Sequence, residues 1–161
     1  MLHDSDTSTA GLKLGYRFQN GVAEYARIQA FNSANGTPLA INPNGGNVGV
    51  GSTMVPSKLH VEGSVGVKVV LKTASYTAAD ETVILVDASG GVRTITLPQA
   101  STVAGRIYYV KKTDSSANAV IIQRSSSDLV DGLTSRSITT QYGCMQVVSA
   151  GGTAWQIIGQ K

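Results

Sequence analysis

The sequence is poor in charge and in cysteine, and each shortage limits what the protein can be. Only 14% of the 161 residues are charged, against roughly 25% in typical soluble domains. Polar uncharged residues must therefore provide the solubility of the surface, or self-association must cover part of that surface. The single cysteine, Cys144, excludes an internal disulfide framework and a metal site built from several cysteines.

Two further shortages exclude membrane and nucleic-acid partners. The longest mostly apolar stretch, residues 65–71, is far shorter than the roughly 20 residues that a membrane-spanning helix needs. The first six residues lack the basic and apolar regions of a signal peptide. The formal charge of +3 arises from scattered Lys and Arg residues, which are too sparse for a surface that follows nucleic-acid phosphates. We therefore expect no membrane insertion and no nucleic-acid partner.

The abundant residues predict an all-β protein. The chain has 18 Val, 15 Thr and 10 Ile residues, which favour strands, and 18 Gly and 17 Ser residues, which favour turns. Residues 11–31 alternate with a period of two, as expected for a β-hairpin. A three-residue loop at Gln19-Asn20-Gly21 is preferred to a two-residue Asn20-Gly21 turn. It pairs Leu14 with Ala26, and it places Gly21 at the left-handed position.

The chain divides into a slender segment, residues 1–72, and a compact β domain, residues 73–161. Residues 32–57 are rich in turn signals and hold too little apolar material to form a core alone, so stacking against copies of the chain is the natural remedy. After residue 73 apolar segments recur about every ten residues, which is typical of a sandwich or barrel. The expected strands are residues 82–87, 92–97, 106–112, 119–124, 137–140, 145–150 and 154–158.

Two patterns resemble the C-terminal, receptor-binding region of bacteriophage tail fibres and tailspikes. Residues 41–51 (INPNGGNVGVG) and 56–63 (PSKLHVEG) resemble a glycine-rich connector common in these fibres. The second half resembles the small β domains at the fibre tips. The residues that carry this second resemblance are Tyr76 and residues 94–98, 105–112 and 155–158.

The resemblance implies a hairpin and connector segment followed by a small β-sandwich-like tip domain, in an intertwined homotrimer at the distal end of a virion fibre. Its function would be non-catalytic attachment to a bacterial surface polysaccharide such as lipopolysaccharide or capsule. The alternative is a purely structural module that trimerises and caps either a fibre or a polysaccharide-degrading spike that lies upstream in the same protein. The charge-poor composition also suits self-association, for which threefold symmetry is one closed solution.

Aromatic side chains with polar neighbours are the groups that a sugar-binding site requires. The candidate glycan-binding residues are Tyr109, Lys111, Tyr142 and Tyr76. Tyr108 and Tyr109 lie on opposite parities of one expected strand, and Lys111 assigns the parity of Tyr109 to the outer face. Trp155 lies among apolar residues in the last expected strand, where we expect it in the core.

Motifs for catalysis, metals and cofactors are incomplete, so we expect no catalytic residues, no metal and no cofactor. Residues 46–53 approach a phosphate-binding loop, but Ser52 stands where the lysine is required. His60 has only His3 as a second histidine, whereas zinc needs three or four ligands. Cys144 is expected as a small buried apolar residue. The acids fall in turn contexts, which favours backbone capping over the paired acids of a glycosidase. They are Asp80, Glu81, Asp87, Asp114, Asp128 and Asp131.

Overall fold

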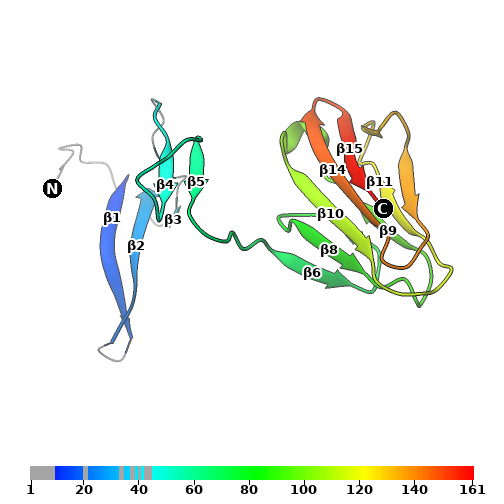
Figure 1. The fold of residues 1–161 in the computed structure, drawn as a ribbon, viewed down its shortest axis with the longest axis horizontal. Helices are drawn as coiled ribbons and strands as arrows, with labels where there is room; N and C mark the ends of the chain where they lie inside the picture. Colours follow the sequence, from blue (N-terminus) through cyan, green and yellow to red (C-terminus); the bar gives the residue numbers. More distant parts are fainter. Residues whose placement is uncertain (1–9, 20–21, 33–34, 37–38, 40, 42–44) are drawn as a thin grey trace. The chain divides into compact units, whose positions relative to one another are not determined.

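A computed structural model describes residues 10–19, 22–32, 35–36, 39, 41 and 45–161 (Figure 1). The expected all-β class is confirmed, since the only helical element of the described residues is a 3-10 turn, η1 (Ala100–Thr102). The chain divides into two units, residues 1–64 and 65–161. The sequence suggested a boundary at residue 72. The structure places it earlier because β6 (Val69–Lys72) hydrogen-bonds to β8 (Val83–Val86) of the C-terminal unit.

The expected N-terminal hairpin is present, but its predicted register is wrong. Strand β1 (Ala10–Gln19) pairs antiparallel with β2 (Val22–Asn32), and Gln19 lies opposite Val22. Leu14 lies opposite Ile28 rather than Ala26. One residue of this difference arises because Gln19 pairs with Val22 and does not belong to the loop, and the other arises from the register shift between Arg17 and Phe18, a bulge that leaves Glu24 unpaired on β2. The loop residues 20 and 21 themselves lie outside the described residues.

The connector consists of very short strands. Strand β3 (Asn35–Gly36) extends the hairpin sheet, and β4 (Val48–Val50) pairs in parallel with β5 (Leu59–Val61). The chain turns back tightly after β4, since a Cβ atom on Gly49 would lie 2.6 Å from the carbonyl oxygen of Ser52. Across residues 45–64 no residue is buried. This stretch has no interior of its own.

The C-terminal unit contains two sheets (Figure 1). The six-stranded sheet has the order β12 (Leu129–Val130), β15 (Ala154–Gln160), β14 (Cys144–Gly151), β10 (Ile107–Lys112), β8 and β6. The four-stranded sheet has the order β13 (Ser135–Ile138), β11 (Val120–Gln123), β9 (Arg93–Thr96) and β7 (Tyr76–Thr77). Every strand predicted after residue 73 is confirmed to within two residues. The sequence missed the two-residue strands β7 and β12.

Successive strands from β6 to β13 alternate between the two sheets. Neighbours in one sheet are therefore parallel: β6, β8 and β10 in the first sheet, and β7, β9 and β11 in the second. The antiparallel strand pairs of this unit are β11 with β13 in the second sheet, and β10 with β14 and β14 with β15 in the first. Along the chain, the two strands of each of these parallel pairs are separated by one strand of the opposite sheet. That strand serves as the crossover connection that parallel neighbours require.

One hydrophobic core lies between the two sheets. Each strand supplies alternate residues to it, for example Ile84 and Val86 of β8, and Ile95 of β9. Tyr108 and Trp155 are fully buried, as the sequence predicted, with ring centroids 5.7 Å apart. The Trp155 Nε1 donates a hydrogen bond to the Pro98 carbonyl at 3.2 Å, which satisfies the only polar group of the indole.

Three acidic or basic side chains of this unit are also fully buried, which the sequence did not predict: Glu81, Lys112 and Asp128. Lys112 Nζ lies 2.6 Å from Asp114 Oδ1, and the backbone N–H of Ala88 donates to Asp114 Oδ2 at 2.7 Å. Burial opposes ionisation of Asp114, but the hydrogen bonds from Lys112, Ser116 and Ala88 outweigh it and lower the pKa of this carboxyl well below its usual range. The group ties the end of β10 to the loop after β8.

Candidate functional site

Two of the four candidate residues, Tyr109 and Lys111, lie on the outer face of the six-stranded sheet, and a third, Tyr142, lies in the turn that leads into β14 of that sheet. The alternation of β10 sends Tyr108, Val110 and Lys112 into the core and leaves Tyr109 and Lys111 on the opposite face. Tyr109 is 36% exposed, whereas Tyr108 is 0% exposed. The predicted outward orientation of Tyr109 is therefore confirmed.

Tyr109 is held in position by the neighbouring strand. It lies opposite Gln146 of β14, and the Gln146 Nε2 donates a hydrogen bond to the Tyr109 hydroxyl at 2.6 Å. Beside them is a hollow of about 250 Å³, lined by both residues and by Cys144 and residues 159–161. Gly159 faces Gln146, and a Cβ there would lie 3.2 Å from Gln146 Oε1, so glycine leaves room for this side chain. The amide orients the tyrosine ring at the edge of an open depression.

Tyr142 lies close to Lys111 at the start of β14. Its backbone has a φ of +62°, its side chain is 56% exposed, and its N–H donates to the Lys112 carbonyl at 2.9 Å. The Lys111 Nζ lies 5.6 Å from the centroid of the Tyr142 ring, within the range of a cation–π contact. The turn is fixed by Gly143, where a Cβ would lie 2.6 Å from Ile138 Cγ2. A left-handed tyrosine on a crowded turn is a strained arrangement of the kind that clusters at functional sites.

Tyr76 lies apart from the other candidates. It belongs to β7 of the four-stranded sheet, is half-buried, and packs against the core. Its hydroxyl donates to Glu81 Oε2 at 3.2 Å, and the Lys72 Nζ lies 3.6 Å from its ring centroid. Burial raises the pKa of Tyr76, and the negative charge of Glu81 raises it further. These contacts assign Tyr76 to packing, apart from the surface group of Tyr109, Lys111 and Tyr142.

The carboxylates are occupied by structural hydrogen bonds. Asp87 Oδ1 accepts from the Ser89 N–H, Asp128 Oδ2 from the Ala100 N–H, and Asp131 Oδ1 from the Ile157 N–H. Glu81 Oε1 accepts from the Ala79 N–H at 2.9 Å. The exposed Asp80 pairs with Lys68, whose ammonium lowers the pKa of that carboxyl. Glu81 and Asp87 accept from a backbone N–H two residues away, as expected at turns, whereas Asp128 and Asp131 accept from N–H groups 28 and 26 residues away and therefore join distant segments.

Cys144 differs from its expected place in the core. It is half-buried on the outer-face parity of β14 and lines the hollow beside Tyr109. The reason is the register of the sheet, in which Cys144 lies opposite the outward Lys111, while Met145 takes the core position.

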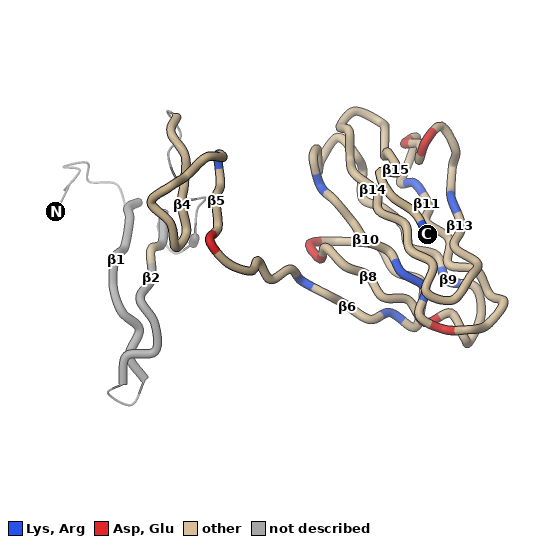
Figure 2. Tube along the Cα trace, viewed as in Figure 1, with Lys and Arg blue, Asp and Glu red and all other residues tan. Residues whose placement is uncertain are grey.

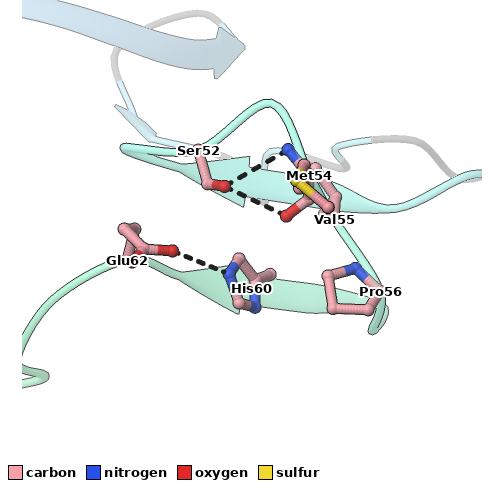
Figure 3. A pocket seen from close by; sticks show the side chains of 6 residues that line it. All are labelled: Ser52, Met54, Val55, Pro56, His60 and Glu62. Atoms are coloured by element: carbon pink, nitrogen blue, oxygen red, sulfur yellow. Dashed lines mark hydrogen bonds and ion pairs between the residues drawn. The ribbon is translucent and has the colours of Figure 1, made fainter.

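A second hollow, of about 550 Å³, lies in the connector (Figure 3). Its apolar wall comes from Met54, Val55 and Pro56, and Met54 is 81% exposed. His60 projects from β5 and Glu62 from the position directly after it, with His60 Nε2 3.3 Å from Glu62 Oε2 (Figure 3). This is the polar strand position expected for His60. Among the described residues no group of three or more His, Cys, Asp or Glu side chains converges as metal ligands.

No protein-family model and no curated protein sequence matches this chain. Within the described residues, no helix has the length and apolar character needed to cross a membrane. The function must therefore be argued from the outer face of the six-stranded sheet and from the unburied connector.

Proposed function

We propose that this chain is the C-terminal tip fragment of a phage tail fibre or tailspike, and that it attaches without catalysis to a bacterial surface glycan. The observation that carries the proposal is the group formed by Tyr109, Gln146 and Lys111 on one open sheet face, with Tyr142 in the adjoining turn and a hollow beside Tyr109. Sugar rings stack on aromatic faces while nearby amides and ammonium groups bond their hydroxyls. This group supplies both kinds of contact.

The proposed oligomer is a homotrimer at the distal end of the virion fibre. Its support is the connector, where Val50, Met54 and Leu59 are 53%, 81% and 63% exposed, and where residues 45–64 contain no buried residue. Parallel strands are found almost only where both faces are covered, yet β4 and β5 pair in parallel. Other copies of the chain would supply the missing cover. Three weak glycan sites on one fibre would then bind by multivalency.

The test is adsorption of the purified protein to glycan arrays and to host cells. Tyr109→Ala removes the central ring, and we expect it to weaken binding about tenfold, the effect of losing one well-placed aromatic contact. Val92→Ala is the control, because Val92 is 51% exposed and lies before β9 of the other sheet. An intact trimer that binds no glycan and no cell would remove the proposal.

A structural capping module is the second candidate, favoured by the apolar half of the same sheet face. Val69 and Leu71 of β6 are 54% and 63% exposed, and in register they lie opposite the half-buried Val83 and Leu85 of β8. Such a patch fits a contact between subunits. Under this candidate, Leu71→Asp lowers the molecular mass in light scattering, whereas Tyr109→Ala leaves adsorption unchanged.

A further inference from the structure

Three hollows adjoin one another around the last residues of β15. The hollow beside Tyr109 shares Cys144, Gln160 and Lys161 with a second one of about 170 Å³. This second hollow shares Ser137, Met145 and Gln160 with a third one of about 400 Å³, which extends along β13 to Arg136. We call the three together the terminal groove. Clefts that hold drug-sized ligands measure about 300–1,000 Å³, so the groove has room for more than one sugar unit.

The chemistry of the groove is hydroxyl-rich and basic. Ser135, Ser137, Thr139 and Thr140 contribute hydroxyl groups, and Gln146 and Gln160 contribute amides. Of the lining residues, Arg136 and Lys161 carry charged side chains, and none is Asp or Glu. Lys111 lies at the Tyr109 end, on the same strand face. Strands β14 and β15 carry no charged residue, so no acid of these strands offsets the basic groups (Figure 2).

The guanidinium of Arg136 is held in an orientation suited to binding an anion. Its Nε donates to the Val130 carbonyl at 3.3 Å and its Nη2 to the Asp131 carbonyl at 2.9 Å, which fixes the plane of the guanidinium. Its Nη1 makes no hydrogen bond to any described residue. The nearby Asp131 carboxylate is turned to the Ile157 N–H at 3.0 Å. A fixed guanidinium is the group best suited to a planar oxyanion such as a carboxylate.

We infer that the ligand of this groove is an acidic polysaccharide whose carboxylate or phosphate groups bind Arg136 while its sugar units extend toward Tyr109. The inference rests on the proposed glycan-binding function and narrows it to the anionic class. Hydroxyl and amide groups along the floor hold the sugars, and the basic residues select charge. Neutral polysaccharides leave the guanidinium without its partner, which costs affinity.

The experiment measures binding of the full chain to purified bacterial polysaccharides in four sets: uronic-acid-bearing, the same polymers after carboxyl reduction, phosphate-bearing, and neutral. We expect binding to one of the anionic sets, and weakening as salt rises. If the carboxylate is the ligand, carboxyl reduction lowers affinity about tenfold. If phosphate is the ligand, only the phosphate-bearing set binds. Equal binding to reduced and native polymers, or binding to neutral polymers alone, overturns the inference and leaves the proposed function standing. Binding to none of the sets overturns both.

Variants locate the effect in the groove. Arg136→Gln is expected to lower affinity for the anionic polymer about tenfold, and Arg136→Lys to restore part of it. Circular dichroism shows whether Arg136→Gln remains folded. If it does not, Lys161→Gln takes its place as the groove variant, because Lys161 is exposed and its replacement should not disturb the fold. Lys68→Gln removes the same charge from a site outside the groove, where Lys68 pairs with Asp80. Equal losses in Lys161→Gln and Lys68→Gln would show a general charge effect and overturn the assignment.

Discussion

Lys112 tests how the C-terminal unit tolerates a buried charge. Its side chain is 0% exposed, and its Nζ lies 2.6 Å from Asp114 Oδ1 and 3.3 Å from Ser116 Oγ. Lys112→Met keeps the length of the side chain but removes the ammonium, so the Asp114 carboxylate stays enclosed without its counter-charge. Removing one partner of a buried ion pair lowers the free energy of unfolding by about 3–5 kcal/mol.

The assay is thermal unfolding followed by calorimetry or circular dichroism. In a domain the size of residues 65–161, a change of 1 kcal/mol shifts the melting temperature by about 4–8 °C, so we expect Lys112→Met to lower it by more than about 10 °C. Lys111→Met is the matched control, because the adjacent lysine lies on the outer face and should shift the melting temperature by less than about 4 °C. Adding Asp114→Asn to Lys112→Met removes the stranded charge and should recover part of the loss. Equal melting temperatures for the two methionine variants would refute the reasoning.

Three further predictions concern other parts of the chain. Because the folded-state pKa of Asp114 is lowered, its contribution to stability is present above the unfolded-state pKa of about 3.9 and is lost as the pH falls below that value, which acid titration of the folded signal measures. Gly143→Ala brings a Cβ to 2.6 Å from Ile138 Cγ2 and should lower the free energy of unfolding by about 1–3 kcal/mol in urea melts. Met54→Asp and Leu59→Asp place charge on the uncovered connector and should lower the mass seen by light scattering from about three times 16.7 kDa toward one. A solitary mass for the unmodified chain would contradict that prediction.

The sequence predicted the strands of the C-terminal unit well because their evidence is local. Alternation along β10 separated Tyr108 from Tyr109, and both assignments are confirmed. The same alternation could not say which strands are neighbours. A spacing of about ten residues is compatible with a hairpin, in which the next strand pairs with the previous one, and also with a connection that places the next strand in the opposite sheet. From β6 to β13 each strand is followed by a strand of the opposite sheet.

The errors in the sequence reading arise where a specific side-chain contact, and not the alternation of the strand, decides the outcome. Lys112 shares the core parity of Tyr108, but general preference places lysine at the surface, and only the partner Asp114 two residues later makes its burial possible. For Tyr76 the error runs the other way, because a residue predicted to bind sugar is occupied by packing. The sequence places it beside a turn, but its hydroxyl hydrogen-bonds to Glu81 and its ring packs under the Lys72 ammonium. The groove around Gln160 joins residues of β10, β13, β14 and β15, which no local pattern could bring together.

The back-and-forth winding of the strands also determines how the C-terminal unit is made. Val69 can pair with Val83, and Val83 with Tyr109, only after the intervening strand has crossed to the other sheet. The parallel pairs therefore cannot form by extension from a tight turn, as a hairpin does. Such long closures are slow, on the order of milliseconds to seconds for β proteins of high contact order. The interior of this unit stays open until the last strand arrives, because β15 supplies the fully buried Trp155.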